Sequence, residues 1–457
     1  MGLDDLTYRD HTRALFRLGL PLIGGHVAQF SVALTDTVML GWYSVDALAA
    51  VVLGTQIFFL AFILGSGFAF AVMPMVAEAF AQNDETSIRR TTRMGMWLSV
   101  IYAVVMLPLF WWSQPVLVAL GQDPDLSASA QDYLRVMGIG LIPALLVMVL
   151  KSYMAALEHT RVVFWITVAA AVINAFVNYA LIFGNWGAPE LGIIGAAIAS
   201  LSVQGVMIAG AIAYTLIKLP EHDLFSRLWR PDFDAMTRVF RIGVPIGLTT
   251  LAEVGLFAAG ALMMGWLGTI ELAAHGIAIN LAGLMFMVHL GLGNAATVRA
   301  GNALGRRDID QLAAGARTGI WMSLIFAVFS IIVFVTQKEW LISLFLDPND
   351  PNFDAIVTTG AAFLIAAAIF QFVDGAQALA LSVLRGIMDT RVPMIMATIS
   401  YWVVGVPVSY IAGFWLGWGG VGIWVGLALG LAVAALLLMW RFWKVMVPRL
   451  RDSAVPV

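Results

Sequence analysis

The sequence predicts an all-α polytopic membrane protein that crosses the bilayer twelve times. Of its 457 residues, 61% are hydrophobic and only 12% are charged, whereas about 25% of residues are charged in a typical soluble domain. Apolar runs of about 20 residues, the length that a helix needs to cross the hydrocarbon core, recur from one end of the chain to the other. The runs are continuous rather than alternating, which favours helices over the strands of a membrane barrel.

We place one membrane span on each apolar run. Several runs exceed about 25 residues, so these helices should tilt or bend. No cleavable signal pattern precedes the first run, so the first span is expected to direct insertion. The predicted spans are 18–42, 48–78, 94–112, 129–150, 162–183, 192–217, 242–266, 272–303, 318–337, 356–384, 392–415 and 420–442.

The basic residues support this topology. If both termini lie in the cytoplasm, all Lys and Arg residues except Arg135 and Lys338 fall in cytoplasmic segments, which is 23 of the 25 in the chain. Such an asymmetry follows the positive-inside rule. An error of one span in the middle of the chain would destroy it, so twelve spans with both termini in the cytoplasm are expected.

The two halves of the chain are similar in sequence. The segment Arg-Leu-Gly-Leu-Pro at 17–21 returns 224 residues later as Arg-Ile-Gly-Val-Pro at 241–245. Six spans per half keep the same orientation, so the repeats are parallel and related by an axis along the membrane normal. We predict an N-terminal six-helix lobe over 1–218, a cytoplasmic linker over 219–240 and a C-terminal six-helix lobe over 241–457, with a central cleft between the lobes.

Three carboxylates, those of Asp36, Glu253 and Asp374, lie inside the predicted spans, and no Lys or Arg lies near the middle of a span. Each such group costs about 2.5–3.5 kcal/mol in the bilayer. In the register of the repeat, Asp36 and Glu253 are seven residues apart, about two helical turns, so each should face the interior of its own lobe. An acidic interior suits Na⁺, H⁺ and organic cations. The alternatives are a carboxylate at the outer interface for Asp36 and helix–helix hydrogen bonds for the other two.

Other polar side chains in the spans allow two interpretations. Asn174 and Asn178 are one helical turn apart on the same face, and Ser200 adds a hydroxyl. Together with a carboxylate, these oxygens suit Na⁺, but Asn pairs in membrane helices also bond helices to each other. Gln56 and Asn280 share one position of the repeat and either line the cleft or join helices.

Enzyme signatures are missing from the sequence. It contains no Walker A motif, no His-Glu-x-x-His and no Gly-x-Ser-x-Gly, and the absence of Cys excludes disulfides and thiolate metal sites. We therefore expect a protein that is not an enzyme, holds no cofactor and takes energy from a Na⁺ or H⁺ gradient. A net charge of −3 gives no reason to expect a nucleic-acid partner.

These features resemble the multidrug and toxic compound extrusion (MATE) family, and most closely its NorM-like bacterial branch. The resemblance covers essentially the whole chain. Besides the three acids, it is carried by Leu-Pro at 20–21, Ala-Leu-Gly-Arg-Arg-Asp at 303–308 and Arg-Gly-Ile-Met-Asp-Thr-Arg at 385–391. It implies a monomer in the bacterial cytoplasmic (inner) membrane that exports cationic and amphiphilic drugs or dyes in exchange for Na⁺ or H⁺ by alternating access.

The resemblance also implies site residues. The N-lobe ion site, for Na⁺, is expected at Asp36 with Asn174, Asn178 and Ser200, and the C-lobe site, for Na⁺ or H⁺, at Glu253 with Asp374. The two C-lobe acids favour the NorM-like over the DinF-like branch. The residues expected to contact substrate are Asp36, Gln56, Asn280, Phe370 and Asp374, with Phe370 standing where some relatives carry Tyr. The alternative function is a lipid-linked precursor flippase of the same general fold, which should carry Lys or Arg inside its cavity.

Overall fold

The computed structural model describes residues 7–454, and over this range all regular secondary structure is helical, with turns and short irregular segments between the helices. Twelve helical segments are long and apolar enough to cross a membrane, which confirms the predicted number of spans. The helices are α1 (Tyr8–Tyr43), α2 (Val45–Ala81), α3 (Glu85–Trp111), α4 (Ser113–Ala119), α5 (Pro124–Met137), α6 (Leu141–Ala156), α7 (Thr160–Phe183), α8 (Gly192–Lys218), α9 (Phe233–Leu267), α10 (Thr269–Gly305), α11 (Ile309–Thr336), α12 (Lys338–Ser343), α13 (Phe353–Gly386), α14 (Arg391–Ile399), α15 (Val406–Tyr410), α16 (Gly419–Trp440) and α17 (Val447–Ala454).

Three membrane spans are assembled from more than one helical segment, and the last of them, Gly419–Ser453, joins α16 to α17 through a π-helical segment at Arg441–Met446. A 3₁₀ turn at Gly138–Gly140 joins α5 to α6, so the fourth span runs over Pro124–Ala156. π-helical segments at Ser400–Gly405 and Ile411–Trp415 flank α15, so the eleventh span runs over Arg391–Trp415. π-helical turns are rare and occur often at functional sites.

The chain divides into two compact units. The N-terminal unit is Gly24–Gly247, and the C-terminal unit combines Leu248–Val457 with the start of the chain up to Ile23. The boundaries therefore pass through α1 and α9 rather than through the polar segment between the two halves of the sequence. The first part of α1 packs in the C-terminal unit, and the first part of α9 packs in the N-terminal unit.

The repeated glycines lie in these exchanged helix starts. A Cβ atom at Gly243 would come within 3.0 Å of the backbone of Phe68 on α2, and one at Gly19 would lie 3.4 Å from Leu292 on α10. A larger residue at 243 would force the two backbones apart. The Gly of the Arg-x-Gly-x-Pro repeat therefore allows a close helix contact.

Polar first turns make several helices longer than the apolar runs predicted. α3 begins at Glu85 and α11 at Ile309, each nine residues before the predicted span. Asp84 caps α3 by accepting a hydrogen bond from the Ser87 amide at 3.0 Å, and Asp308 caps α11 through the Gln311 amide at 2.9 Å. These caps satisfy amide groups that have no partner within the helix. Asp84 and Asp308 occupy the same position of the repeat.

The segment 219–240, predicted to be a linker, is held against the N-terminal unit, and its last eight residues already belong to α9. Arg93 of α3 donates to the Leu224 carbonyl at 2.7 Å, and Trp97 donates to the Leu228 carbonyl at 2.7 Å. The hydroxyl of Tyr153 on α6 lies 2.5 Å from His222 Nδ1. The polar composition of the segment thus reflects specific hydrogen bonds rather than a free chain.

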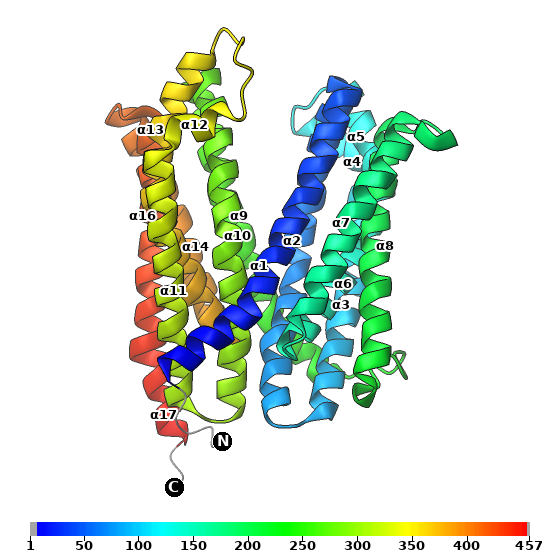
Figure 1. Ribbon diagram of the computed structural model, residues 1–457, viewed down its shortest axis with the longest axis vertical. Helices are drawn as coiled ribbons and strands as arrows, with labels where there is room; N and C mark the ends of the chain where they lie inside the picture. The colour runs from blue at the N-terminus through cyan, green and yellow to red at the C-terminus, as the bar shows by residue number, and fades with distance from the viewer. Residues whose placement is uncertain (1–6, 455–457) are drawn as a thin grey trace. The chain divides into compact units, whose positions relative to one another are not determined.

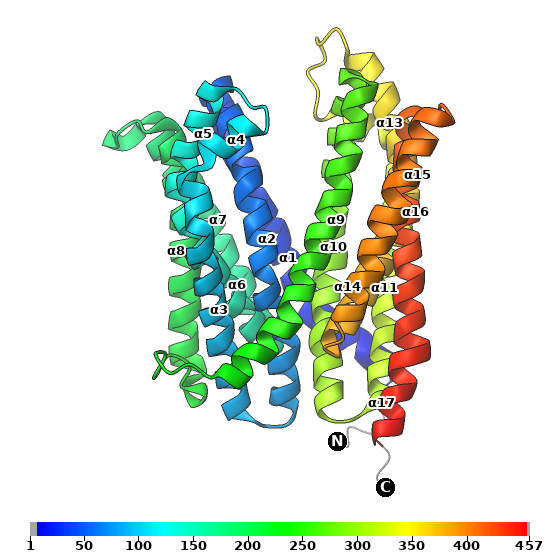
Figure 2. The same cartoon turned by 180° about the vertical axis from the view of Figure 1, so that it is seen from behind.

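One helix lies at the centre of each unit. In the N-terminal unit α2 packs against α3, α5 and α6, and in the C-terminal unit α13 packs against α10, α11 and α16 (Figures 1 and 2). The α13–α16 contact contains Phe370 and the fully buried Trp424, whose ring centroids are 5.5 Å apart. These contacts hold the polar side chains of the two units in place.

Candidate functional site

Four predicted residues of the N-terminal unit meet in the structure. Asp36 of α1 accepts hydrogen bonds at Oδ1 from Asn174 Nδ2 (3.1 Å) and Asn178 Nδ2 (2.5 Å) of α7. Its other oxygen, Oδ2, accepts from Ser200 Oγ of α8 at 3.3 Å. Asn178 also donates to Asn174 Oδ1 at 3.2 Å. Three helices thus converge on one carboxylate.

The local sequence explains this convergence. The spacing of four residues places both Asn side chains on one face of α7. α8 packs along α7, and Gly195 allows the approach, because a Cβ atom there would lie 2.5 Å from the Leu181 carbonyl oxygen. Ser200 lies five residues after Gly195 on α8, and its hydroxyl reaches Asp36.

The Asp36 cluster has the composition of a site for a hard cation. The carboxylate, the two amide oxygens and the hydroxyl are oxygen donors. Asn174 and Asn178 are fully buried, and Asn178 Oδ1 has no hydrogen-bond partner. Rotating an Asn amide exchanges its nitrogen and oxygen, so both amides can direct oxygen toward a bound ion. Na⁺ therefore fits the residues present, and so does a proton carried by Asp36.

Tyr133 is a neighbour of this cluster that the sequence did not single out. Its ring is buried near Asp36 and Ser200, and its hydroxyl accepts from Thr55 at 3.3 Å. No local pattern points to Tyr133, because it comes from a different span and is one of nine tyrosines.

The C-terminal unit brings the other two predicted acids together. Glu253 of α9 lies close enough to Asp374 of α13 for their charges to repel. Asp374 is buried, and its Oδ1 has no hydrogen-bond partner. On either side of it on α13, the buried Gln371 and Gln377 each leave Oε1 without a partner. The face of α13 around Asp374 therefore presents several free oxygen acceptors.

A π-helical segment adds a tyrosine to this group. Tyr401 lies at the start of the Ser400–Gly405 segment and accepts a hydrogen bond from Gln377 Nε2 at 2.6 Å. The next residue, Trp402, donates to the Ala252 carbonyl at 3.2 Å, which places the segment beside Glu253. No sequence pattern points to Tyr401, because an apolar run does not show where a π-helical turn will form.

The expectation that no basic group lies beside the buried acids is wrong for Glu253. Arg385 was placed just past the tenth span, but α13 continues to Gly386, and Arg385 attracts Glu253 electrostatically. It lies 11 residues, about three turns, after Asp374 and thus on the same face of α13. In the N-terminal unit, Lys151 likewise lies within α6 rather than past its end.

The remaining predicted substrate contacts are scattered. Gln56 on α2 and Asn280 on α10 are both exposed and belong to different units. Asn280 bonds back to the Gly276 carbonyl of its own helix at 2.8 Å. Phe370 is buried, with its ring edge-to-face against Phe257 at 5.8 Å between centroids.

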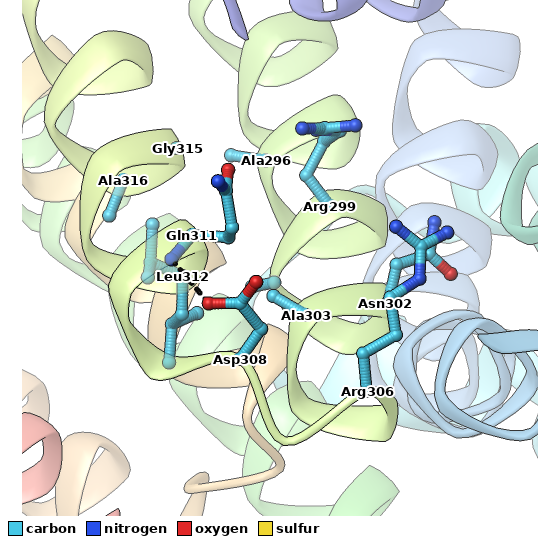
Figure 3. Close-up of a pocket in the computed structure, with 12 residues that line it drawn as sticks. Ala296, Arg299, Asn302, Ala303, Arg306, Asp308, Gln311, Leu312, Gly315 and Ala316 are labelled. Carbon is cyan, nitrogen blue, oxygen red and sulfur yellow. Dashed lines mark hydrogen bonds between the residues drawn. The ribbon is translucent and has the colours of Figure 1, made fainter. Parts of the chain in front are cut away.

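A separate polar pocket lies where α10 turns into α11 (Figure 3). It is lined by Arg299, Asn302, Arg306, Asp308 and Gln311, so it contains part of the segment 303–308 that carries the family resemblance. The dashed line in Figure 3 marks the cap bond from the Gln311 amide to Asp308. Arg299 lies 3.1 Å from His11 Nδ1 on α1. Arg299, which lines the pocket, thus connects α10 to the start of α1. No group of three or more His, Asp or Glu residues that could hold a metal ion is found in the part of the chain that the structure describes.

Known proteins resemble this chain along its whole length. The MatE family model matches residues 21–180 and 245–411. A protein of Rhizobium meliloti named "Probable multidrug resistance protein NorM" is 43% identical, with 100% of this chain and 97% of that protein covered. A protein of the same name from Agrobacterium fabrum is 42% identical, with 94% and 93% covered.

Solved structures share the fold. An outward-facing MATE family transporter of the MOP superfamily superposes with a TM-score of 0.88 at 19% identity, with 97% of each chain covered. The eukaryotic MATE transporter AtDTX14 superposes with a TM-score of 0.86 at 18% identity, covering 98% of this chain and 100% of that one. With the family model and the full-length relatives, these findings show that the chain belongs to the MatE family of multi-pass membrane transporters and is not an enzyme.

Proposed function

We propose that this transporter exports cationic and amphiphilic organic compounds in exchange for Na⁺ or H⁺ by alternating access. The observation that carries the proposal is the carboxylate of Asp36, held by Asn174, Asn178 and Ser200. The names of the full-length relatives, which are multidrug resistance proteins, support drug efflux. They do not support the alternative of a lipid-linked precursor flippase.

In the proposed mechanism, Asp36 binds either the organic cation or the coupling ion. When Asp36 is ionised and accepts its three hydrogen bonds, its charge attracts a cationic substrate. When Na⁺ binds, the amides of Asn174 and Asn178 turn their oxygens inward, and the negative charge is neutralised. A proton on Asp36 has the same effect. Because the two ligands compete for one charge, each lowers the affinity for the other.

Glu253 and Asp374 form a second coupling site in this proposal. Two carboxylates this close favour the uptake of a shared cation or proton. Arg385 compensates the charge of Glu253, so Asp374 is the acid that changes its charge during transport. The oxygens of Gln371 and Gln377 are then additional ligands for Na⁺ beside Asp374.

The remaining expectations follow from membership of the family. We propose a monomer in the bacterial cytoplasmic membrane with both termini in the cytoplasm, because that orientation places almost all Lys and Arg residues on the cytoplasmic side. No cofactor is required beside the coupling ion.

The test uses purified protein in proteoliposomes. Ethidium efflux is measured under a pure Na⁺ gradient and then under a pure pH gradient, for the wild type, Asp36→Asn and Asp374→Asn. Each variant should lose efflux driven by the ion that couples transport while its melting temperature stays close to that of the wild type. Asp132→Asn is the matched control, because the Asp132 side chain is 65% exposed and pairs only with Arg135 at the surface. Full efflux by Asp36→Asn would remove Asp36 from the mechanism.

A further inference from the structure

A second polar group lies on α1 in the N-terminal unit, two turns before Asp36. Lys151 of α6 donates from Nζ to Gln29 Oε1 at 3.1 Å, and His26, one turn earlier on α1, lies within electrostatic range of Lys151. Gln29 is exposed, and His26 and Lys151 are partly exposed. A ligand can therefore reach this group.

Lys151 has no acidic partner among the side chains that the structure describes. The salt bridges that the structure describes join Arg residues to Asp or Glu, and none contains Lys151. An ammonium group inside a membrane helix is costly and generally faces a water-filled cavity or a partner. Gln29 satisfies one of its three N–H donors and leaves its charge uncompensated.

The repeat shows how the other half of the chain treats the same position. Gln29 corresponds to Glu253. Gln29 accepts a hydrogen bond from Lys151, and Glu253 is attracted electrostatically by Arg385, so each faces a basic residue near the end of the fourth span of its own half. In the C-terminal unit the carboxylate of Glu253 compensates Arg385. In the N-terminal unit the neutral amide of Gln29 cannot compensate Lys151, so a positive charge remains for a ligand.

Gln29, which binds Lys151, lies at a fixed spacing from Asp36 along α1. Gln29 and Asp36 are seven residues apart on α1, which places them on one face and about 10 Å apart along the helix axis. The flexible four-carbon stem of Lys151 lets its ammonium group move toward a ligand that is bound at Asp36. One face of α1 thus has the anionic Asp36 at one end and, at the other, Gln29 with the cationic Lys151 of α6 bound to it.

We propose that Lys151, supported by Gln29 and His26, is an anion-recognising subsite for the carboxylate of zwitterionic organic substrates. The inference rests on the proposed function, in which Asp36 holds the cationic end of the substrate. Lys151 then extends the substrate range from cations to amphiphilic zwitterions and determines which of the two is bound more tightly.

The experiment compares two dyes that differ only in a carboxylate. Rhodamine B is a zwitterion, and its ethyl ester is a cation with the same aromatic system. Binding of both to the purified full-length protein is measured by fluorescence polarisation. Lys151→Gln should weaken rhodamine B binding about tenfold or more, the effect of losing one hydrogen bond to a charged group, and should leave the ester unchanged. Lys151→Arg should retain most of the affinity for rhodamine B.

A second variant tests the idea without removing the lysine. Gln29→Glu introduces the carboxylate that the other half of the chain carries, so it should compensate Lys151 and weaken rhodamine B binding selectively. Lys218→Gln is the matched control, because Lys218 is exposed at the end of α8. Melting temperatures verify that each variant is folded.

The outcomes separate the two proposals. The anion subsite is overturned if Lys151→Gln and Gln29→Glu lower the affinity for both dyes equally. It is also overturned if these variants leave the affinity for rhodamine B unchanged, or if the wild type does not bind rhodamine B. Asp36→Asn should weaken both dyes. If it weakens neither, the proposed role of Asp36 fails, while the selectivity of the Lys151 and Gln29 variants still supports or overturns the anion subsite on its own.

Discussion

The ion pair between Asp389 and Arg441 leads to a quantitative prediction about a segment that carries the family resemblance. Asp389 lies in the segment 385–391, directly after α13, and Arg441 follows α16. Arg441 donates from Nε to Asp389 Oδ2 at 2.5 Å and from Nη2 to Oδ1 at 3.0 Å. The two side chains are only 14% and 11% exposed. This bidentate geometry suggests that the segment stabilises the C-terminal unit rather than binding a ligand.

The expected loss follows from these contacts. Removing one partner of a buried ion pair costs about 3–5 kcal/mol, because the other charge remains without compensation. Some water reaches both groups, so we expect about 2–4 kcal/mol for Arg441→Met or Asp389→Asn. For a unit of this size, that loss lowers the melting temperature by about 5–10 °C. The double variant Asp389→Leu/Arg441→Met removes both charges and should recover most of the loss.

The assay is thermal unfolding of detergent-solubilised protein at one fixed heating rate, followed by intrinsic tryptophan fluorescence. Arg451→Gln is the control, because Arg451 pairs with Asp310 at the surface, with side chains 57% and 87% exposed. Such a pair contributes about 0–1 kcal/mol. If Arg441→Met behaves like this control, or if the double variant is as unstable as the sum of the single ones, the reasoning about burial is wrong.

Two further predictions concern the N-terminal unit. Gly195→Ala should lower the melting temperature and weaken ion binding at Asp36, because its Cβ atom would lie 2.5 Å from the Leu181 carbonyl oxygen. Gly205→Ala on the same helix is the control, because a Cβ atom there meets open space and should have neither effect. If the two variants behave alike, the close α7–α8 contact is contradicted. Burial lowers the pKa of His222, so the native state favours neutral His222, and this stabilisation is present above about pH 6.5 and is lost as pH falls. The protection factors of amides in 219–232, corrected for the intrinsic pH dependence of exchange, should therefore fall below that pH in the wild type, and pH-independent protection factors would refute the assignment.

Local patterns were sufficient for the spans and for placing two Asn side chains on one helix face. Hydropathy and charge asymmetry depend only on neighbouring residues and on the side of the bilayer, so they predicted the twelve spans. The spacing of Asn174 and Asn178 is likewise a property of one helix. Only the meeting of α1, α7 and α8 at Asp36 needed the family resemblance, and the structure places these side chains together as the resemblance implied.

The apolar runs underestimated the length of the helices, so basic residues that were predicted to lie outside the spans lie inside helices. Hydropathy ends a span at the first charged residues, but a capped helix continues through them. Arg385 and Lys151 therefore lie inside α13 and α6 although the apolar runs stop before them. The interior that was predicted to be purely acidic contains Lys151 in the N-terminal unit and Arg385 in the C-terminal unit.

By itself, the sequence determined the number of spans, the two similar halves and the three acids within the spans, because each of these is encoded in residue type and spacing. The tertiary structure alone decided that the unit boundaries cross α1 and α9, that Tyr401 and Arg385 accompany Glu253 and Asp374, and that Lys151 meets Gln29. These contacts join residues more than 20 positions apart or depend on a π-helical turn. Packing between distant segments creates them, and no periodicity within a single span records it.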